Sequence, residues 1–283
     1  GLKIYPLAKA GDPPAMEFKN MSGLAGYNTL MPNDVTFFDV VNEIVQEEAD
    51  GWLDPELAGQ LRAVGIVKGQ QFDPDDQLKK MLADAVAIGN AYARVNTVYP
   101  QDEGSYIYHD EHTEWVMAYP DKDTTFLQEG ARRMDGRLWM HYNAVCVTPA
   151  MAVTKPGAGS DYMITGLDGK GRPLDGAKTY KLHLPANFPV QDNWSVTIYD
   201  PQTRSMLQTD QPFAGINSLS ADQTQNDDGS IDVVFAPESP AGMEKNWIQT
   251  IPGKSWFILL RAYGPLEPWI DKTWRPSQVE LVS

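Results

Sequence analysis

The sequence predicts an α+β protein, in which a small helical subdomain is followed by an antiparallel β-sandwich. The first observation is that the spacing of apolar residues changes from a helical to a strand period near Thr148. The second is that short β segments, separated by Gly, Pro and Asp, follow one another from Lys181 onward. The third is the content of 8 Trp, 12 Tyr and 9 Phe in 283 residues, which favours bulky layers of a β-rich scaffold.

Residues 1–32 contain many prolines and glycines and show little periodicity, so they are typical of an extended arm or connector. A surface strand with loops would have a similar composition. Asn33 or Asp34 can cap a helix over the apolar-periodic run that follows. Asp54 and Pro55 begin a second, short helix, with a cap followed by proline at the first helical position.

Asp73 and Pro74 repeat this arrangement before a longer helix that extends from Asp75 to about Asn96. The three helices predict a helical subdomain over residues 33–97. The apolar residues of the third helix follow a helical period and predict a buried stripe. Its members are Leu78, Met81, Leu82, Ala85, Ile88 and Tyr92.

Residues 98–283 are expected to hold a helix and then the sandwich. Residues 104–120 are aromatic and irregular or strand-like, and Asp123 caps a predicted helix that extends to about residue 145. Ser255–Tyr263 is apolar at nearly every position, which predicts a strand covered on both faces. Asn226–Gly229 is a tight-turn sequence between β segments.

Composition excludes some classes of function. The net charge is −15, and a surface so acidic repels phosphates, so we predict no nucleic-acid partner. High charge also favours solubility. No apolar run approaches the roughly 20 residues that a membrane-spanning helix needs. The single cysteine, Cys146, lies in an apolar run and is expected to be a buried, slowly reacting thiol.

Motifs for common cofactors and nucleophiles are absent: the sequence has no H-E-x-x-H, G-x-S-x-G, Walker loop or G-x-G-x-x-G. We therefore predict no cofactor. His109–His112, followed by Glu114, has the residue types of a metal site, but the neighbouring residues indicate a strand, where the two histidines point to opposite sides. A solvated acidic loop fits better, so we predict no metal site.

Arg261 lies inside the most apolar segment of the chain. A guanidinium cannot lose its proton, so burial requires a carboxylate or an anionic ligand near it. If other polar residues converge on it, they form a cationic, aromatic-walled pocket for a small anionic molecule. The alternative is structural, with Arg–Asp pairs joining strand ends. The candidate ligand-binding residues are Arg204, Arg261, Lys245, Trp247 and Asp200, and the candidate general acids or bases are His141 and His183.

The segments HYNAVCVTPAM (141–151), NWSVTIYDPQTRSML (193–207) and DGSIDVVFAPESPAGMEKNWIQTIPGKSWFILLRAYGP (228–265) resemble a bacterial family of paired domains of unknown function, numbered 1254 and 1214. The resemblance implies an immunoglobulin-like first domain, a helical insert and a sandwich of jelly-roll type. The first domain is almost wholly absent from this sequence, and residues 1–32 are then expected to be its remnant. We therefore expect that domain as a separate partner, or a homo-oligomer. The resemblance also implies a periplasmic or extracellular location.

Two classes of function follow from these residues. An enzyme would be a hydrolase of phosphate esters or other small anions, with the arginines and Lys245 holding the anion and a histidine transferring protons. A non-catalytic module would bind carbohydrate or another ligand on an aromatic face, through Trp194, Trp247 or Trp269. A structural or assembly subunit is the third reading. Convergence of the cations with a histidine would favour the enzyme, aromatic residues along an open face would favour the binding module, and neither would favour the structural subunit.

Overall fold

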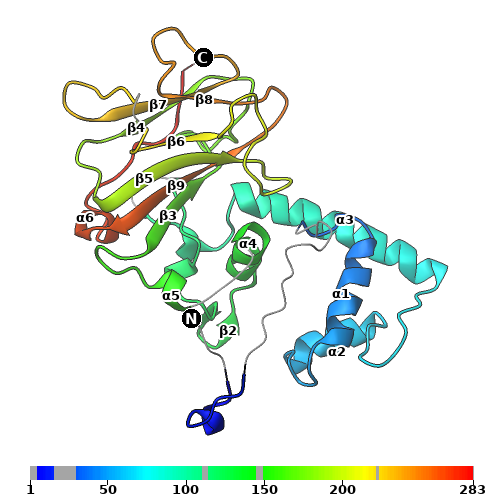
Figure 1. Cartoon of the computed structure of the whole chain (residues 1–283). Coiled ribbons are helices and arrows are strands. Elements are labelled where there is room, and N and C mark those ends of the chain that lie inside the picture. Colours follow the sequence, from blue (N-terminus) through cyan, green and yellow to red (C-terminus); the bar gives the residue numbers. More distant parts are fainter. Residues whose placement is uncertain (1–4, 16–29, 110–113, 145–148, 221–222, 283) are drawn as a thin grey trace. The chain divides into compact units, whose positions relative to one another are not determined.

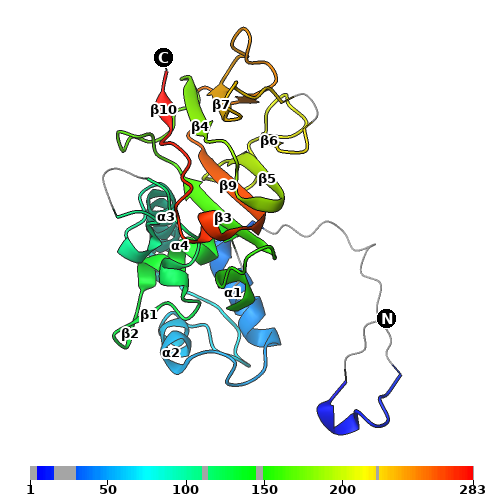
Figure 2. The same ribbon diagram turned by 90° about the vertical axis from the view of Figure 1, so that its left-hand side faces the viewer.

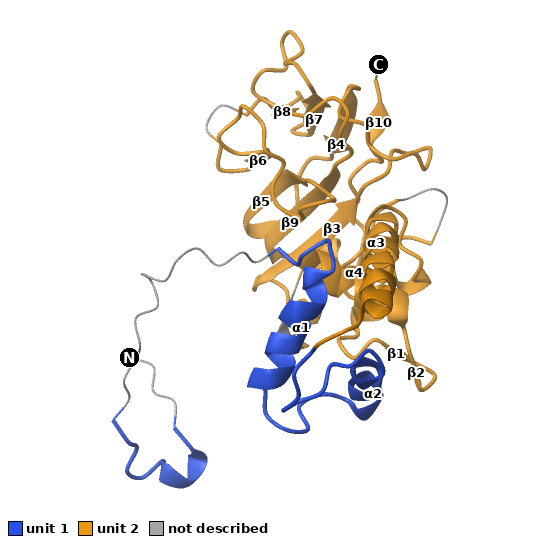
Figure 3. Ribbon diagram, turned by 90° about the vertical axis from the view of Figure 1, so that its right-hand side faces the viewer, with its two compact units in different colours: residues 1–72 blue, residues 73–283 orange. Residues whose placement is uncertain are grey.

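The computed structural model describes residues 5–15, 30–109, 114–144, 149–220 and 223–282. The chain divides into two compact units, residues 1–72 and 73–283 (Figure 3). The expected boundaries at residues 32 and 97 differ from this division and stay a prediction. Cys146 and residues 110–112 of the His109–His112 cluster, His112 included, lie outside the described residues.

In the first unit, the two expected helices are present: α1 covers Thr36–Glu47 and α2 covers Pro55–Ala63, after a 3-10 turn at Leu7–Lys9. The Asp34 carboxylate accepts a hydrogen bond of 3.0 Å from the backbone N–H of Thr36. The Asp54 carboxylate accepts one of 2.9 Å from Glu56. Both aspartates thus satisfy N–H groups that a helix leaves without partners at its start.

The second unit begins with α3, Asp76–Val98 (Figure 1). The predicted buried stripe of this helix is wrong for Met81, Ile88 and Tyr92, which are 59%, 71% and 43% exposed. Leu82, also in the prediction, is buried, and so is Ala93, which was not predicted. The reason is that α3 carries apolar residues on more than one face. Helix α4 packs on the face that includes Ala93, and not on the face that includes Met81 and Ile88. There the Asn96 side chain donates a hydrogen bond of 2.9 Å to the carbonyl of Asp135 in α4.

The segment between α3 and α4 contains the 3-10 turns η2, Glu103–Ser105, and η3, Pro120–Lys122. The predicted helix from Asp123 is also wrong in its first half, because strands β1, Leu127–Gln128, and β2, Ala131–Arg132, form a hairpin there. Glu129 and Gly130 join them with φ angles of +51° and +81°, which a helix does not allow. The Asp123 carboxylate accepts from Thr125 and Leu127 and closes a turn instead.

Helices α4, Met134–Ala144, and α5, Pro149–Ala152, follow the hairpin. Trp139 and Met140 of α4 are buried in a cluster with Ile164 and Phe257 of a sheet. These contacts place α4 against the outer face of that sheet, as Figures 1 and 2 show.

Two four-stranded sheets, in the orders β3-β9-β5-β6 and β10-β4-β7-β8, form the rest of the unit. Their pairs are antiparallel apart from β7 and β8. A short helix, α6, covers Glu267–Ile270. The strands are β3 Ser160–Thr165, β4 Tyr180–Leu184, β5 Val190–Tyr199, β6 Gly215–Asn217, β7 Ile231–Ala236, β8 Trp247–Gln249, β9 Phe257–Pro265 and β10 Glu280–Leu281.

The two sheets bury their inner faces in one hydrophobic core, which takes Val196 from β5, Leu260 from β9 and Leu182 and Phe235 from the other sheet. The predicted mixture of helices with largely antiparallel sheets is therefore confirmed. Strand β9 is central and buries residues on both faces, as expected for the segment from Ser255. The sheets are open, and the jelly-roll type is not established by their order.

Candidate functional site

Arg261 of β9 lies on the outer face of its sheet, opposite Tyr162 of β3 in the strand register. Its guanidinium carbon lies 4.1 Å from the ring centroid of Tyr263 and 5.1 Å from that of Tyr162. Its Nη2 donates a hydrogen bond of 3.1 Å to the Ser160 hydroxyl. Strand alternation gathers these residues, because positions 160 and 162 of β3 and 261 and 263 of β9 point to the same side.

The charge of Arg261 has no carboxylate partner within 4.0 Å among the described residues. Its Nε is buried and also has no hydrogen-bond partner there. Two aromatic faces attract the cation, but they do not satisfy an N–H group in the guanidinium plane. Nε and Nη2 form one edge of the guanidinium, the edge that binds an oxyanion with two hydrogen bonds.

Tyr199, at the end of β5, stacks on Phe257 of β9 and interacts electrostatically with this group. Burial raises the pKa of Tyr199, the charge of Arg261 acts to lower it, and the neighbouring Tyr263 and Tyr162 raise it further. The hydroxyls of Tyr162 and Ser160 lie 3.2 Å apart. We name Ser160, Tyr162, Tyr199, Arg261 and Tyr263 the arginine–tyrosine cluster. The three tyrosines were missed in the sequence, although two of them had a usable signal: Tyr162 lies two residues from Ser160, and Tyr263 lies two residues from Arg261.

Arg204 and Asp200 lie in the turn after β5. Asp200 does not pair with either arginine: its carboxylate binds the Lys254 ammonium at 2.5 Å. Burial opposes the charge of Asp200, but Lys254 and the Gln202 N–H outweigh it, so the pKa of Asp200 lies below its ordinary value. Arg204 has a φ of +59°.

The guanidinium carbon of Arg204 lies 4.2 Å from the ring centroid of Tyr142 in α4. The Tyr142 hydroxyl is buried and has no hydrogen-bond partner within the described part of the chain. Arg204 therefore has its own aromatic contact with the helix that covers this sheet, and no described contact joins it to Arg261.

The two candidate histidines have other contacts. His141 is exposed on α4, and its Nδ1 lies 2.8 Å from the carbonyl of Arg137. His183 is on β4 of the other sheet, and its Nδ1 lies 2.7 Å from the Asp232 carboxylate. Neither contact involves the arginine–tyrosine cluster.

Lys245 and Trp247 also belong to the other sheet. Lys245 is exposed just before β8, and the Trp247 indole donates a hydrogen bond of 2.9 Å to the carbonyl of Ala236. Between them, Asn246 is 3% exposed and bonds to Thr224 and Asp232. This segment therefore ties loops to β7, and its described bonds do not direct Lys245 or Trp247 toward Arg261.

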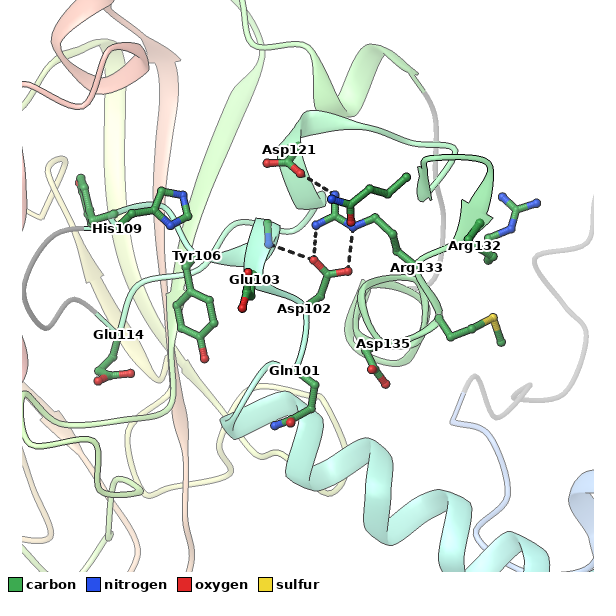
Figure 4. A pocket seen from close by; sticks show the side chains of 15 residues that line it. Gln101, Asp102, Glu103, Tyr106, His109, Glu114, Asp121, Arg132, Arg133 and Asp135 are labelled. Carbon is green, nitrogen blue, oxygen red and sulfur yellow. Dashed lines mark hydrogen bonds and ion pairs between the residues drawn. The ribbon is translucent and has the colours of Figure 1, made fainter.

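A large polar cleft lies elsewhere in the second unit, between η2, the β1–β2 hairpin and the start of α4 (Figure 4). Its volume is about 970 Å³. Arg133 lines this cleft. Its Nε donates a hydrogen bond of 2.9 Å to the Asp102 carboxylate, and its Nη1 pairs with the Asp121 carboxylate at 2.6 Å. These two carboxylates neutralise the guanidinium, which therefore offers little charge to an anionic ligand.

The remaining charges of the cleft are mostly acidic. Glu103, Glu114 and Asp135 contribute carboxylates, and Arg132 is the second arginine of the lining. Burial, and then the charge of Glu114, raises the pKa of Tyr106 on the same wall. The cleft thus suits a positively charged or neutral polar molecule better than a phosphate ester. Among the described residues, no group of three or more His, Cys, Asp or Glu could hold a metal ion.

Comparison with solved structures finds similar chains of low sequence identity. A solved structure of the VPA0106 protein from Vibrio parahaemolyticus is 16% identical, with a TM-score of 0.42, and the match covers 96% of this chain and 59% of that one. An uncharacterized protein from Burkholderia cenocepacia is 13% identical, with a TM-score of 0.31, covering 87% of this chain and 49% of that one. The chain thus spans only about half to three fifths of the length of these structures.

No curated protein matches the sequence. A family does match its C-terminal part, over residues 159–267, which include β3, β9 and the whole arginine–tyrosine cluster. This region carries most of the segments on which the resemblance was based. The resemblance to the domain numbered 1214 is therefore confirmed: residues 159–267 match the family described as "Protein of unknown function (DUF1214)".

Proposed function

We propose that the protein binds a small oxyanion, such as phosphate, sulfate or a carboxylate, at the arginine–tyrosine cluster. The observation that carries this proposal is the Arg261 guanidinium, which has a buried, unpartnered Nε and no carboxylate within 4.0 Å among the described residues. A partly buried charge without a counter-charge is costly, and an anion would remove that cost. Tyrosine and serine hydroxyls beside it can donate further hydrogen bonds.

Hydrolysis of a phosphate ester is the finer proposal, and it needs a general acid or base next to the anion. His141 and His183 remain candidates by residue type, but their described contacts are with Arg137 and Asp232. The tyrosine hydroxyls are the only groups with a titratable proton that the described contacts place in the cluster. Binding is therefore the part of the proposal with geometric support.

A carbohydrate-binding face is supported less well. Trp194 and Trp269 are 4% and 0% exposed, and both stack on Phe188 inside the core. Trp247 is half-buried and holds its indole N–H against Ala236. Stacking on a sugar needs an open aromatic face.

We also propose, from the resemblance, that the sandwich is of jelly-roll type and that the protein is periplasmic or extracellular. No helix among the described residues is long and apolar enough to cross a membrane. Fractionation of cells that produce the native gene product would test the location, and recovery in the cytoplasm would contradict it.

Calorimetry tests the binding proposal. Phosphate, sulfate and acetate are titrated into the wild-type chain, the Arg261→Met variant and an Arg62→Met control, which loses an exposed arginine of α2. We expect at least one anion to bind the wild type and the control but not Arg261→Met, while circular dichroism shows all three folded. Absence of binding to the folded wild type, or equal binding by Arg261→Met, would refute the proposal.

A further inference from the structure

A second cationic site lies beside β3, in a small cavity that shares only Tyr162 with the arginine–tyrosine cluster. The cavity measures about 20 Å³, slightly more than the 10–15 Å³ that a single water needs. Its wall is mostly apolar or aromatic. The lining residues are Met117, Ala118, Tyr119, Lys122, Met151, Ala152, Asp161, Tyr162 and Lys272.

Lys272 is partly buried at this cavity, and its ammonium makes no hydrogen bond or ion pair within the described part of the chain. Its nearest described cation–π contact is the Trp269 ring, 5.5 Å from Nζ. The Asp161 carboxylate, which could have paired with it, accepts a hydrogen bond of 3.0 Å from the Trp269 indole. The amine is thus held at the cavity without a direct counter-ion.

Both lysines of the cavity have unusual backbones: φ is +65° at Lys272 and +59° at Lys122. Residues other than glycine rarely adopt this left-handed region, and such strain of about 1–3 kcal/mol is concentrated at functional sites. Two lysines in this conformation, from segments 150 residues apart in the sequence, line the same small cavity.

The electrostatic environment favours the neutral amine. Burial lowers the pKa of Lys272, and the neighbouring Lys122 lowers it too, whereas Asp161 and Asp271 act in the opposite direction. A lysine in an apolar site beside a second cation is the arrangement that activates an amine as a nucleophile. The hydroxyls of Tyr119 and Tyr162 also line the cavity.

We propose that Lys272 is a reactive amine that forms a Schiff base with a small aldehyde or ketone. The Nζ lone pair adds to the carbonyl carbon, a C–N bond forms, and the carbonyl oxygen takes a proton to give a carbinolamine. The nitrogen releases one of its two protons as the carbinolamine forms. Protonation of the hydroxyl and its loss as water then leave a protonated C=N bond, and release of the second nitrogen proton gives the neutral Schiff base. Lys122 and Asp161 also line the cavity, and we assign them as the proton donor and the proton acceptor of this step. The cavity is only slightly larger than one water needs, so it admits the carbonyl group of such a compound and little more, which restricts the compound to the smallest aldehydes.

Reductive labelling tests this inference. The full chain is incubated with a low concentration of acetaldehyde and cyanoborohydride at pH 7, and peptides are analysed by mass spectrometry at increasing times. We expect Lys272 to be ethylated several-fold faster than the exposed Lys79 and Lys170, which are the internal controls. Labelling of Lys272 at or below the rate of these controls would overturn the inference.

The Lys122→Gln variant provides a second readout. It keeps Lys272 but removes the neighbouring ammonium, so the pKa of Lys272 should rise and its labelling at pH 7 should slow toward that of Lys79. An unchanged rate and pH profile would contradict the role of the lysine pair. The result is separate from the anion proposal, because phosphate binding at Arg261 can be measured on the same variant and should persist.

Discussion

At the scale of single residues, the second unit depends on a buried ion pair that the sequence did not reveal. The side chains of Arg133 and Asp102 are 9% and 8% exposed, and Asp102 contacts both Nε and Nη2 of the guanidinium. The chain around the pair leaves no space: a Cβ on Gly136 would lie 2.6 Å from Pro120 and 2.8 Å from the Asp102 carboxylate. Gly136 therefore permits the close approach of α4 to this pair.

We expect Asp102→Ala to destabilise the second unit by about 3–5 kcal/mol, because it leaves the Arg133 guanidinium buried without its main counter-charge. Urea denaturation measures the change. Asp121→Ala is the matched control: Asp121 binds the same guanidinium, but its side chain is 64% exposed, so the loss should be much smaller. Equal losses for the two variants would contradict the assigned importance of burial.

A second prediction at this scale concerns acid. Hydrogen bonds and ion pairs hold the pKa of Asp168 and of Asp200 below the ordinary value of 3.8, despite the opposing effect of burial. The unfolded chain therefore binds these protons first as pH falls. The stabilisation is complete above about pH 4 and is lost as pH falls through the lower, folded-state pKa.

Urea midpoints measured between pH 6 and pH 3 should fall steeply for the wild type, and the fall should be smaller in Asp200→Asn, which has no charge to protonate. Asp227→Asn is a suitable control, since Asp227 is exposed in a turn. A pH dependence that Asp200→Asn leaves unchanged would assign the acid sensitivity to other groups.

At the scale of elements, the sequence predicted what depends on local chemistry. The start of α2 follows from the capping Asp54, and the start of α1 follows Asp34, which binds the Thr36 N–H. The central strand β9 follows from its continuous apolar run. Prediction from the sequence failed where contacts between elements, and not the local sequence, select one of several structures that fit the same apolar pattern. The apolar face of α3 that α4 covers is one example, and the β1–β2 hairpin, set by left-handed backbone at Glu129 and Gly130, is another.

The start of α3 gives a test of local capping. The sequence predicted that Asp73, followed by Pro74, caps this helix. In the structure the cap is Asp75, whose carboxylate accepts a hydrogen bond of 2.8 Å from the Leu78 N–H. Asp75→Ala should therefore lower the free energy of unfolding by about 0.5–2 kcal/mol. Asp73→Ala, two residues away and also exposed, should change it little. Urea denaturation compares the two, and the reverse order would refute the assigned cap.

At the scale of the whole molecule, the candidate site was also predictable from the sequence only in part. Arg261 could be found from sequence because a charge inside an apolar strand is locally conspicuous. The residues that surround Arg261 could not be predicted from the sequence. Which residues face it depends on the pairing of β3 with β9 and on the packing of α4 against that sheet. Lys245, Trp247 and His183 share residue types with such a site but belong to the other sheet.

The last prediction concerns association. On α3, a stripe of apolar residues repeats with alternating spacings of three and four, the pattern by which two helices interlock. It includes Met81, Ile88, Tyr92 and Val95, which are 59%, 71%, 43% and 53% exposed. Such a stripe is complementary to a second copy of itself, as a two-fold interface requires. We therefore expect the chain to self-associate through α3.

Light scattering coupled to gel filtration, over a range of protein concentrations, should show a dimer for the wild type. Ile88→Lys places a charge in the centre of the stripe, where pairing would bury it, so this variant should be monomeric. Ala83→Lys adds the same charge at an exposed α3 position outside the stripe and should leave the dimer intact. Because Ile88 is the most exposed of these residues, its substitution should not reduce thermal stability of the monomer. A wild type that stays monomeric at the highest concentration, or a dimer that persists in Ile88→Lys, would show that α3 does not mediate association.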